Sequence, residues 1–493
     1  MSIFSEYLKK MREESKLSIT AISGLSGVDR TTIHKMLSDD RIPPSEEPVF
    51  KLAEALALNS TKTKELLRRY QIISLGEETY YRRKDIEDFI CVYDNVGEEE
   101  ENLLVTEERI RLEVKQETTV IRQRDVIVDV VCGLLGEAVY KGEEEISIIL
   151  QPENHEILNC LRKIGKKGCN VKIQHLVCLD NTEYEWTNRN HNLIYLKNIV
   201  PLIVKYAEYE IYYYYDAIGS HINENSVMPY CIITREYLCL LSYAMDAAVL
   251  TKNKDMINLY QKQFKKQIEK TEPLLHSIDV PNDYKEGLII QEDMVNMNGK
   301  AYALENAPCM GPYLTKEMVY QCTNGKYISK EMAWKLLQIN KKNIEKMKEK
   351  RGMCFYFPDV GIEKFARRGR IIGIPDQAYD PIPLKYTIQL LETAYDAMKK
   401  GEAEGYMVKS EIFTSLDHVY LDVIDKDHVQ FFISPEAGRS QRVVIHEKKT
   451  CNAFYDFMES LKGGRLVYEQ EEMFRYFDMV LGKLKAELER EKM

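Results

Sequence analysis

The chain has 493 residues, too many for one hydrophobic core, so we expect several domains. With 44% hydrophobic and 30% charged residues, it is neither collagen-like, mucin-like nor wholly disordered. Its net charge of −10 argues against a nucleic-acid partner for the chain as a whole. However, residues 1–84 carry fifteen Lys and Arg against twelve Asp and Glu, which leaves −13 on the remainder. The first segment is therefore the part suited to an anionic partner.

Compartment and membrane association follow from other features of composition. No run approaches eighteen uninterrupted apolar residues, and the first residues lack a signal peptide's basic end and apolar centre. Eleven cysteines occur without a single C-x-x-C pair, which is typical of reduced thiols. We therefore expect a cytoplasmic protein that does not enter a membrane.

The first seventy residues carry the pattern of a small helical domain. Phe4, Leu8 and Met11 lie at i, i+4 and i+7, which predicts an amphipathic helix. Ser18 is a suitable N-cap for a second helix, and Gly27 can adopt the left-handed conformation of the turn that ends it.

A third helix is predicted after Asp29, its N-cap, with Ile33 and Leu37 on the buried face. The residues left pointing outward are Arg30, Thr31, His34 and Lys35. Two short helices joined by a Gly-containing turn, the second presenting cations and hydroxyls, form the geometry of a DNA-reading helix-turn-helix. Arg and Lys donate to guanine, and Thr contacts bases or phosphates.

This segment resembles the Cro/phage-repressor (XRE-like) class of helix-turn-helix domains. The matching residues are Leu8, Arg12, Leu17-Ser18, Ile22, Gly27-Val28, Arg30-Thr31-Thr32-Ile33 and Leu52-Ala53-Glu54-Ala55-Leu56. The resemblance implies that Arg30, Thr31 and Lys35 contact base edges. It also implies that Thr32, Ser18 and Thr20 lie near phosphates. We expect His34 to face solvent or phosphate rather than a metal, because no second His or Cys lies near it.

Three residues depart from the pattern of that class. Ile19 stands where a Gln often contacts the backbone, Leu37 replaces the acidic partner of Arg12, and Asp39 replaces a Gly. The departures affect affinity more than fold. An alternative interpretation is a helical bundle that binds only protein.

The rest of the chain is predicted to be an α/β (α+β) body, which makes the protein multidomain with an all-α N-terminal domain. We expect a helix-turn-helix domain at 1–70 and a helical, acidic connector at 71–125, with its boundary at the Glu-rich stretch 97–102. A first α/β lobe is expected at 126–280, because strand and helix patterns alternate from Ile146 to Ile173 as in a βαβ unit. A helical intervening region at 281–383 and a second α/β lobe with a C-terminal helix at 384–493 follow.

The second lobe repeats part of the first in pattern. Leu391–Met398 followed by Lys400-Gly401-Glu402 parallels Gly133–Val139 followed by Lys141-Gly142-Glu143, and hairpin patterns occur at 230–241 and 420–433. By this alignment the second copy lacks residues 155–225. Two related lobes are one hypothesis, and they would leave a cleft between them.

Few residues of the body suggest catalysis. The phosphate loop, nucleophile elbow and zinc-helix motifs do not occur, and Asp425, Asp427 and His428 fit a hairpin turn better than a metal site. The lobes faintly resemble the phospholipase D-like fold, whose motif is H-x-K-x-x-x-x-D. His446 and Lys448 match it, but Ala453 replaces the acid, so the resemblance implies a non-catalytic lobe. We therefore expect neither enzymatic activity, cofactor nor metal.

A tyrosine-rich stretch, 206–215, is the candidate for ligand binding. Tyr209, Tyr212 and Tyr214 would offer aromatic faces and hydroxyls to a small organic effector. The alternative is that these tyrosines line a half-buried strand or a subunit interface.

Taken together, these features predict a transcription regulator. Its N-terminal domain would read double-stranded DNA, and its body would form a homodimer on a palindromic operator and sense an effector. The alternatives are an enzyme or a defence or mobile-element protein with an autoregulatory helix-turn-helix, and a scaffold that binds protein only.

Overall fold

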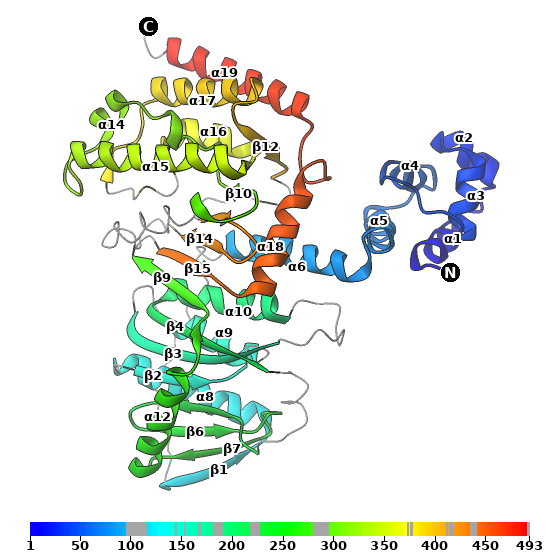
Figure 1. The fold of residues 1–493 in the computed structure, drawn as a ribbon. Coiled ribbons are helices and arrows are strands. Elements are labelled where there is room, and N and C mark those ends of the chain that lie inside the picture. The colour runs from blue at the N-terminus through cyan, green and yellow to red at the C-terminus, as the bar shows by residue number, and fades with distance from the viewer. Residues whose placement is uncertain are drawn as a thin grey trace. The chain divides into compact units, whose positions relative to one another are not determined.

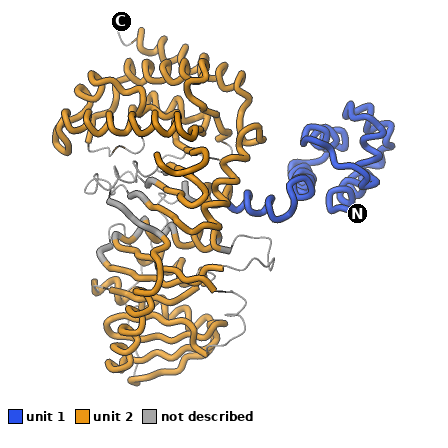
Figure 2. The backbone as a smooth tube through the Cα atoms, in the orientation of Figure 1, with its two compact units in different colours: residues 1–85, 185–190 blue, residues 86–184, 191–493 orange. Residues whose placement is uncertain are grey.

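The computed structural model describes residues 1–94, 116–142, 145–151, 154–165, 169–180, 191–216, 227–279, 295–371, 374, 378–410, 413, 419–433 and 441–490. These residues form two compact units that divide between Asp85 and Ile86, inside one helix (Figure 2). The acidic stretch 97–102, where we predicted the boundary, lies outside the described residues. No helix in the described ranges has the length and apolarity needed to cross a membrane.

The first unit is all-helical. Its helices are α1 (Ile3–Ser15), α2 (Ile19–Ser26), α3 (Arg30–Ser38), α4 (Glu47–Ala55), α5 (Ser60–Leu75) and the first half of α6 (Glu77–Asp94). One apolar stripe from each of the first five helices faces a shared core, in which Phe4, Leu8, Ile33 and Leu52 are at most 2% exposed. The predicted amphipathic periodicity is thus what assembles this unit.

The second unit contains two mixed sheets. Sheet A has the strand order β1-β7-β6-β5-β2-β3-β4-β8. Strands β2, β3 and β4 are parallel, and the other pairs are antiparallel. Its strands are β1 (Thr118–Arg122), β2 (Glu145–Ile149), β3 (Cys169–Asp180), β4 (Tyr206–Asp216), β5 (Tyr230–Ile233), β6 (Leu238–Leu241), β7 (Ala247–Thr251) and β8 (Glu272–Pro273).

Sheet B has the strand order β12-β11-β10-β13-β14-β15-β9. Strands β10, β11 and β12 are parallel, and the remaining pairs are antiparallel. Its strands are β9 (Leu275–Asp279), β10 (Ala301–Leu304), β11 (Met353–Pro358), β12 (Glu404–Val408), β13 (Val419–Val423), β14 (Val429–Ile433) and β15 (Gln441–Ile445).

Apart from β8, the two sheets have the same topology. In each sheet, three parallel strands adjoin a three-stranded antiparallel meander. The strand that comes before these six in sequence, β1 in sheet A and β9 in sheet B, pairs with the last strand of the meander at the edge of the sheet. The hypothesis of two related lobes is consistent with this order, and the hairpins β5–β6 and β13–β14 occupy equivalent places as predicted, but the alignment of the two helices is wrong. Helix α17 (Leu384–Lys399) precedes β12, the third parallel strand, whereas α8 (Arg124–Tyr140) precedes β2, the first.

The predicted helical region 281–383 also requires correction. It contains β10 and β11, which are central strands of sheet B, so the second lobe begins near residue 275. β10 has only four residues, and its Ala-Tyr-Ala-Leu sequence carries little strand signal. The end of this region, residues 355–383, includes most of β11 and all of α16 (Asp359–Arg368).

Helices cover both faces of each sheet (Figure 1). The outer face of sheet A packs against α12 (Lys254–Ile268), and the outer face of sheet B packs against a helical layer. Between the sheets a single core replaces the expected cleft, with Phe89, Phe431 and Phe454 in mutual ring contact. The helices of this core are α8, α9 (His155–Ile164), α10 (His191–Lys205), α18 (Lys448–Leu461) and the end of α6. Those of the outer layer on sheet B are η1 (Gly311–Tyr313), α14 (Lys316–Cys322), α15 (Lys330–Arg351), α16, α17 and α19 (Gln470–Arg490).

Candidate nucleic-acid interface

The turn between α2 and α3 is fixed by local hydrogen bonds. Gly27 adopts a left-handed conformation with φ of 70°, and its amide donates to the Ser23 carbonyl at 2.9 Å. The Ser23 hydroxyl donates to the Val28 carbonyl at 2.7 Å, and the Val28 amide donates to Ser26 Oγ at 3.1 Å. Asp29 then caps α3 by accepting the Thr32 amide. Because every residue of the turn is engaged, α3 has a defined direction relative to α2.

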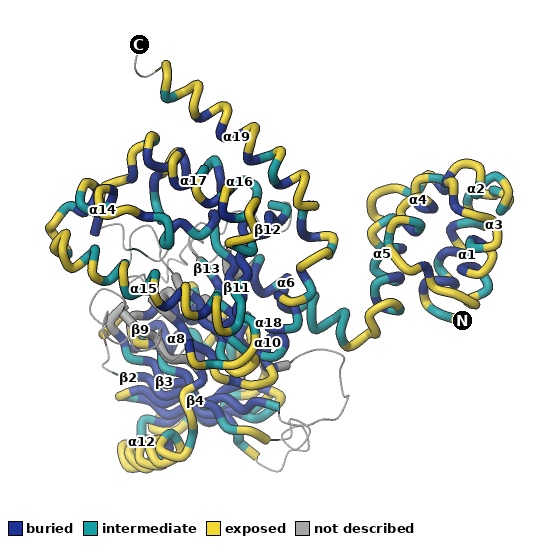
Figure 3. Tube along the Cα trace, turned by 45° about the horizontal axis from the view of Figure 1, so that its top comes forward, coloured by how far each residue is buried: buried dark blue, intermediate teal, exposed yellow. Residues whose placement is uncertain are grey.

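Helix α3 has one buried and one exposed face. Ile33 and Met36 are 1% exposed, and Leu37 is 5% exposed. Arg30, Thr31, His34 and Lys35 are exposed, and Thr32 is half-buried. The exposed face of α3 is visible in Figure 3. The structure therefore brings the predicted base-contacting residues together on one helical face.

Two of the positions predicted to lie near phosphates, Ser18 and Thr20, are at the start of α2. Ser18 and Thr20 are both exposed. Ser18 caps the helix, since its hydroxyl oxygen accepts the Ala21 amide at 3.2 Å. Amides at a helix N-terminus favour an anion through their orientation and the helix dipole. The first turn of α2 thus offers a positive end beside the exposed face of α3.

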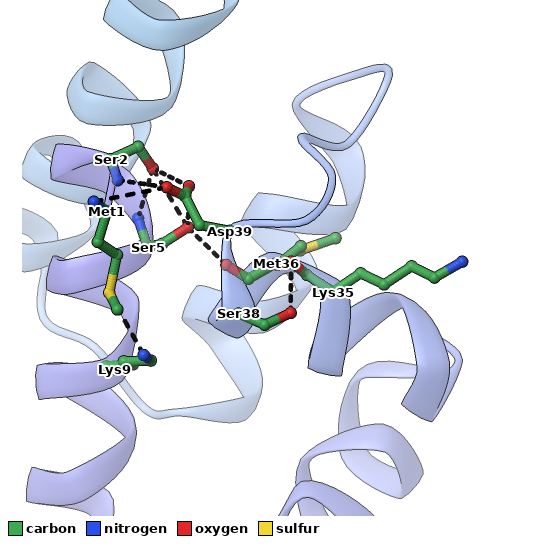
Figure 4. Close-up of polar contacts among 8 residues, drawn as sticks. All are labelled: Met1, Ser2, Ser5, Lys9, Lys35, Met36, Ser38 and Asp39. Atoms are coloured by element: carbon green, nitrogen blue, oxygen red, sulfur yellow. Dashed lines mark hydrogen bonds and ion pairs between the residues drawn. The ribbon is translucent and has the colours of Figure 1, made fainter.

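A polar cluster that we did not predict fixes the end of α3. Asp39 ends the helix in a left-handed conformation with φ of 69°, where the resembling family has Gly. Its carboxylate accepts the Ser2 amide at 2.6 Å, the Ser2 hydroxyl at 2.5 Å and the Ser5 hydroxyl at 2.9 Å (Figure 4). The Ser2 hydroxyl, followed by that of Ser5, lowers the pKa of Asp39 by hydrogen bonding. These bonds offset the strain of a non-glycine residue with positive φ.

The same cluster connects α1 to α3. Ser5 is 2% exposed, and its hydroxyl donates to the Met36 carbonyl at 2.6 Å. Lys35, one residue earlier, extends away from α1 (Figure 4). The sequence signal for this arrangement is Ser2, a capping residue directly before an apolar stripe. The cluster positions α3 without occupying its exposed face.

The tyrosines predicted to bind a ligand do not form one site. They alternate along β4, so Tyr209 faces the core between the sheets and Tyr212 and Tyr214 face the side covered by α12. Tyr209 is 6% exposed, and its hydroxyl lies 2.9 Å from Nδ1 of the buried His175. The alternative interpretation, tyrosines lining a half-buried strand, describes this segment, so we withdraw the joint site.

The other residues considered for chemistry have structural partners. Asp425 Oδ1 accepts the Asp427 amide at 2.8 Å and contacts His428 Nδ1 at 2.9 Å, as expected for a hairpin turn. Ala453, which replaces the acid of the phospholipase D-like motif, is fully buried in the core between the sheets. Among the described residues, no three His, Cys, Asp or Glu side chains are grouped as metal ligands.

Two solved structures show low similarity to the chain. TrmBL2, described as an archaeal chromatin protein with a novel mode of DNA binding, is 14% identical with a TM-score of 0.22, over 55% of this chain and 99% of that one. Phosphatidylserine synthase from Haemophilus influenzae Rd KW20 is 10% identical with a TM-score of 0.25, over 76% and 94%. At such TM-scores neither likeness supports an argument about fold or function.

Sequence comparison identifies the N-terminal unit. No curated protein matches the chain. Residues 8–61, however, match the family model of helix-turn-helix domains, and this range contains α2, the turn and α3. The observed caps and turn agree with the match. Residues 8–61 of this multidomain chain are therefore a helix-turn-helix domain.

Proposed function

We propose that the protein is a sequence-specific DNA-binding transcription regulator. The observation that carries the proposal is the exposed face of α3, on which Arg30, Thr31, His34 and Lys35 are accessible while Ile33 and Leu37 anchor the opposite face. In this proposal Arg30, Thr31 and Lys35 contact base edges in the major groove. Thr32, Ser18 and Thr20 contact phosphates, which sets the register of the domain.

We further propose that the chain acts as a homodimer. A single helix-turn-helix reads few base pairs, so two copies on a palindrome with half-sites about 34 Å apart would supply the required contacts. The body would sense an effector by favouring one spacing of the two recognition helices. A preference of about 3 kcal/mol changes operator occupancy by up to about a hundredfold.

The body is proposed to act by binding rather than by catalysis. The buried Ala453 at the position of the motif's acid supports this, because no carboxylate at that point would orient His446 for nucleophilic attack. An enzyme would instead show turnover that is lost when a single residue of the body is changed.

The test of DNA recognition is selection from a genomic DNA library followed by a salt titration. We expect a palindromic site whose affinity falls steeply with salt. The double variant Arg30→Ala, Lys35→Ala should lose at least about a hundredfold in affinity and its sequence preference. The variant Lys51→Ala, Lys64→Ala removes the same charge from exposed positions on α4 and α5, and should keep the preference.

Either of two results would overturn the proposal. One is that the Arg30, Lys35 variant selects the same sequence as the unmodified protein. The other is that the control variant loses preference equally, since the effect would then reflect net charge alone.

A further inference from the structure

Strand β1 forms an open edge of sheet A. It pairs with β7 on one side, and no described strand pairs with it on the other (Figure 1). Its sequence Thr-Thr-Val-Ile-Arg has high β propensity and contains neither Pro nor Lys, the residues that commonly block strand edges. Val120, at its centre, is 63% exposed. The edge is thus competent to pair with another strand.

The hydrogen-bond pattern identifies which backbone groups are available. The Lys252 amide donates to the Glu117 carbonyl at 2.9 Å, and Thr119 and Ile121 follow at intervals of two residues. Because bonded and non-bonded pairs alternate in an antiparallel ladder, residues 117, 119 and 121 bond toward β7. The amides and carbonyls of Thr118, Val120 and Arg122 therefore point outward.

This outward set is self-complementary. If a second copy of β1 approaches antiparallel with Val120 at the two-fold axis, Val120 lies opposite Val120, and Thr118 lies opposite Arg122. All three outward residues then occupy hydrogen-bonded positions. Centring the pair on Thr119 or Ile121 would also pair outward groups, but it would leave Arg122 or Thr118, respectively, without an outward partner in β1.

The side chains on the outer face of sheet A also suit pairing between two copies of β1. The strand register places one apolar row across the outer face of sheet A. Its members are Tyr212, Leu176, Ile149, Cys231, Leu240, Val249 and Val120. Exposure rises from 8% at Leu240 to 63% at Val120, so the row is covered at its centre and open at the edge. In the two-fold pair, Val120 of each copy extends this row into the other.

The charges at the ends of β1, and a comparison with the equivalent strand of the second lobe, favour pairing of this edge with another sheet. Glu117 precedes β1 and Arg122 ends it, so antiparallel pairing brings an acidic end near a basic one. In sheet B the equivalent strand is β9, which continues from β8, a strand of sheet A. The corresponding edge of the second lobe is thus a junction between sheets, with Leu274 buried at the crossing.

We propose that two copies of the chain dimerise through β1, which joins their A sheets into one continuous sheet. This inference rests on the proposed function, because it names the surface that forms the dimer on a palindromic operator. It is independent of α3, which lies in the other compact unit.

Val120→Pro is the sharpest test. It removes an amide that points outward, so the β1–β7 ladder keeps its bonds, and proline is tolerated at such positions. Two inter-chain bonds are lost per dimer, and the dimer dissociation constant should rise about thirtyfold. Val120→Lys should also dissociate the dimer by opposing two like charges on the axis. Light scattering should give twice 57.6 kDa for the unmodified protein and 57.6 kDa for both variants at the same concentration.

Cross-linking tests the register. Opposed residues of a hydrogen-bonded pair have Cα atoms about 5.5 Å apart, which a disulfide can span. Val120→Cys should therefore form a covalent dimer on mild oxidation, above the level of the unmodified protein. Arg122→Cys should not, because residue 122 lies opposite Thr118 rather than itself. Circular dichroism at each step confirms that the variants are folded.

Several outcomes would overturn the proposal. They are an unmodified protein that is monomeric, folded Val120 variants that stay dimeric, and equal cross-linking at positions 120 and 122. Failure of the proposed function looks different. In that case the dimer and the cross-link persist while DNA selection is absent, whereas a Val120 variant that loses dimerisation keeps an intact α3.

Discussion

The Tyr215 hydroxyl donates a 2.9 Å hydrogen bond to the Glu447 carboxylate, joining two residues separated by 232 positions. Tyr215 is the penultimate residue of β4 of the first lobe, and Glu447 caps α18 of the second by accepting the amides of Lys449 and Thr450. Glu447 is 1% exposed. A buried carboxylate therefore ties the two lobes together while it is fully engaged with donors.

Tyr215→Phe should destabilise the body. Removing one donor from a buried charged acceptor lowers the free energy of unfolding by about 1.5–3 kcal/mol. Urea denaturation of the full chain measures the change. Tyr260→Phe is the matched control, because no hydrogen bond of the Tyr260 hydroxyl links it to a described residue, and it should shift the midpoint little. Equal shifts for both variants would contradict the assigned role.

Substitutions of Asp39 should separate its hydrogen bonds from its backbone conformation. Asp39→Ala removes the acceptor for Ser2 and Ser5 and keeps the strain of positive φ, whereas Asp39→Gly removes the acceptor and also relieves that strain. Gly should therefore be less harmful than Ala by about 1 kcal/mol. Hydrogen exchange of the peptide that covers α3 provides the measurement. Faster exchange in the Gly variant than in the Ala variant would contradict the assignment.

Acid should destabilise the first lobe through His175. This side chain is fully buried between the Leu150 carbonyl at 2.8 Å and the Tyr209 hydroxyl, and burial lowers its pKa to about 4. An unfolded histidine has a pKa near 6.5. Below that pH the unfolded state binds a proton that the folded state does not, so stability falls until pH reaches about 4.

Between pH 7 and pH 5 this effect lowers the free energy of unfolding by about 2 kcal/mol. Comparing urea denaturation at the two pH values for the unmodified chain and His175→Gln isolates this contribution, because the other titrating groups are common to both. The exposed His34→Gln should retain the full decrease. A decrease of the same size in His175→Gln would rule out His175 as its origin.

Gly361 should tolerate no side chain. A Cβ at this position of α16 would lie 1.8 Å from the Asn306 carbonyl oxygen, a backbone atom that cannot move without displacing the loop after β10. Gly361→Ala should therefore lower the melting temperature strongly or prevent folding. Gly482→Ala in α19 meets no atom within 4 Å and should be neutral or stabilise by up to about 1 kcal/mol.

Local patterns predicted the helix-turn-helix well. Ser18, Gly27 and Asp29 cap or end helices as expected, because each acts through bonds to residues within a few positions. The buried face containing Ile33 and Leu37 could be predicted equally well, since helical periodicity decides which side faces the core. The match to the helix-turn-helix family confirms the domain, while the DNA contacts remain predictions.

Long-range pairing could not be predicted in the same way. The central strand β10 is short, and its neighbours β11 and β13 come from segments 49 and more residues away, so no local signal reveals it. The tyrosines of β4 were misinterpreted because residues adjacent in sequence alternate between two faces of a sheet. Asp39 was noted only as a departure, since its partners Ser2 and Ser5 lie more than thirty residues away.

The shared strand order of the two lobes has a consequence for specialisation. In a symmetric assembly of identical halves, any substitution appears twice, and a binding surface on the axis must suit a symmetric molecule. Here both halves belong to one polypeptide, so Lys252 can occupy the position before α12 that His446 occupies before α18. Each half can thus evolve separately, and the pair is free to recognise something with no symmetry of its own.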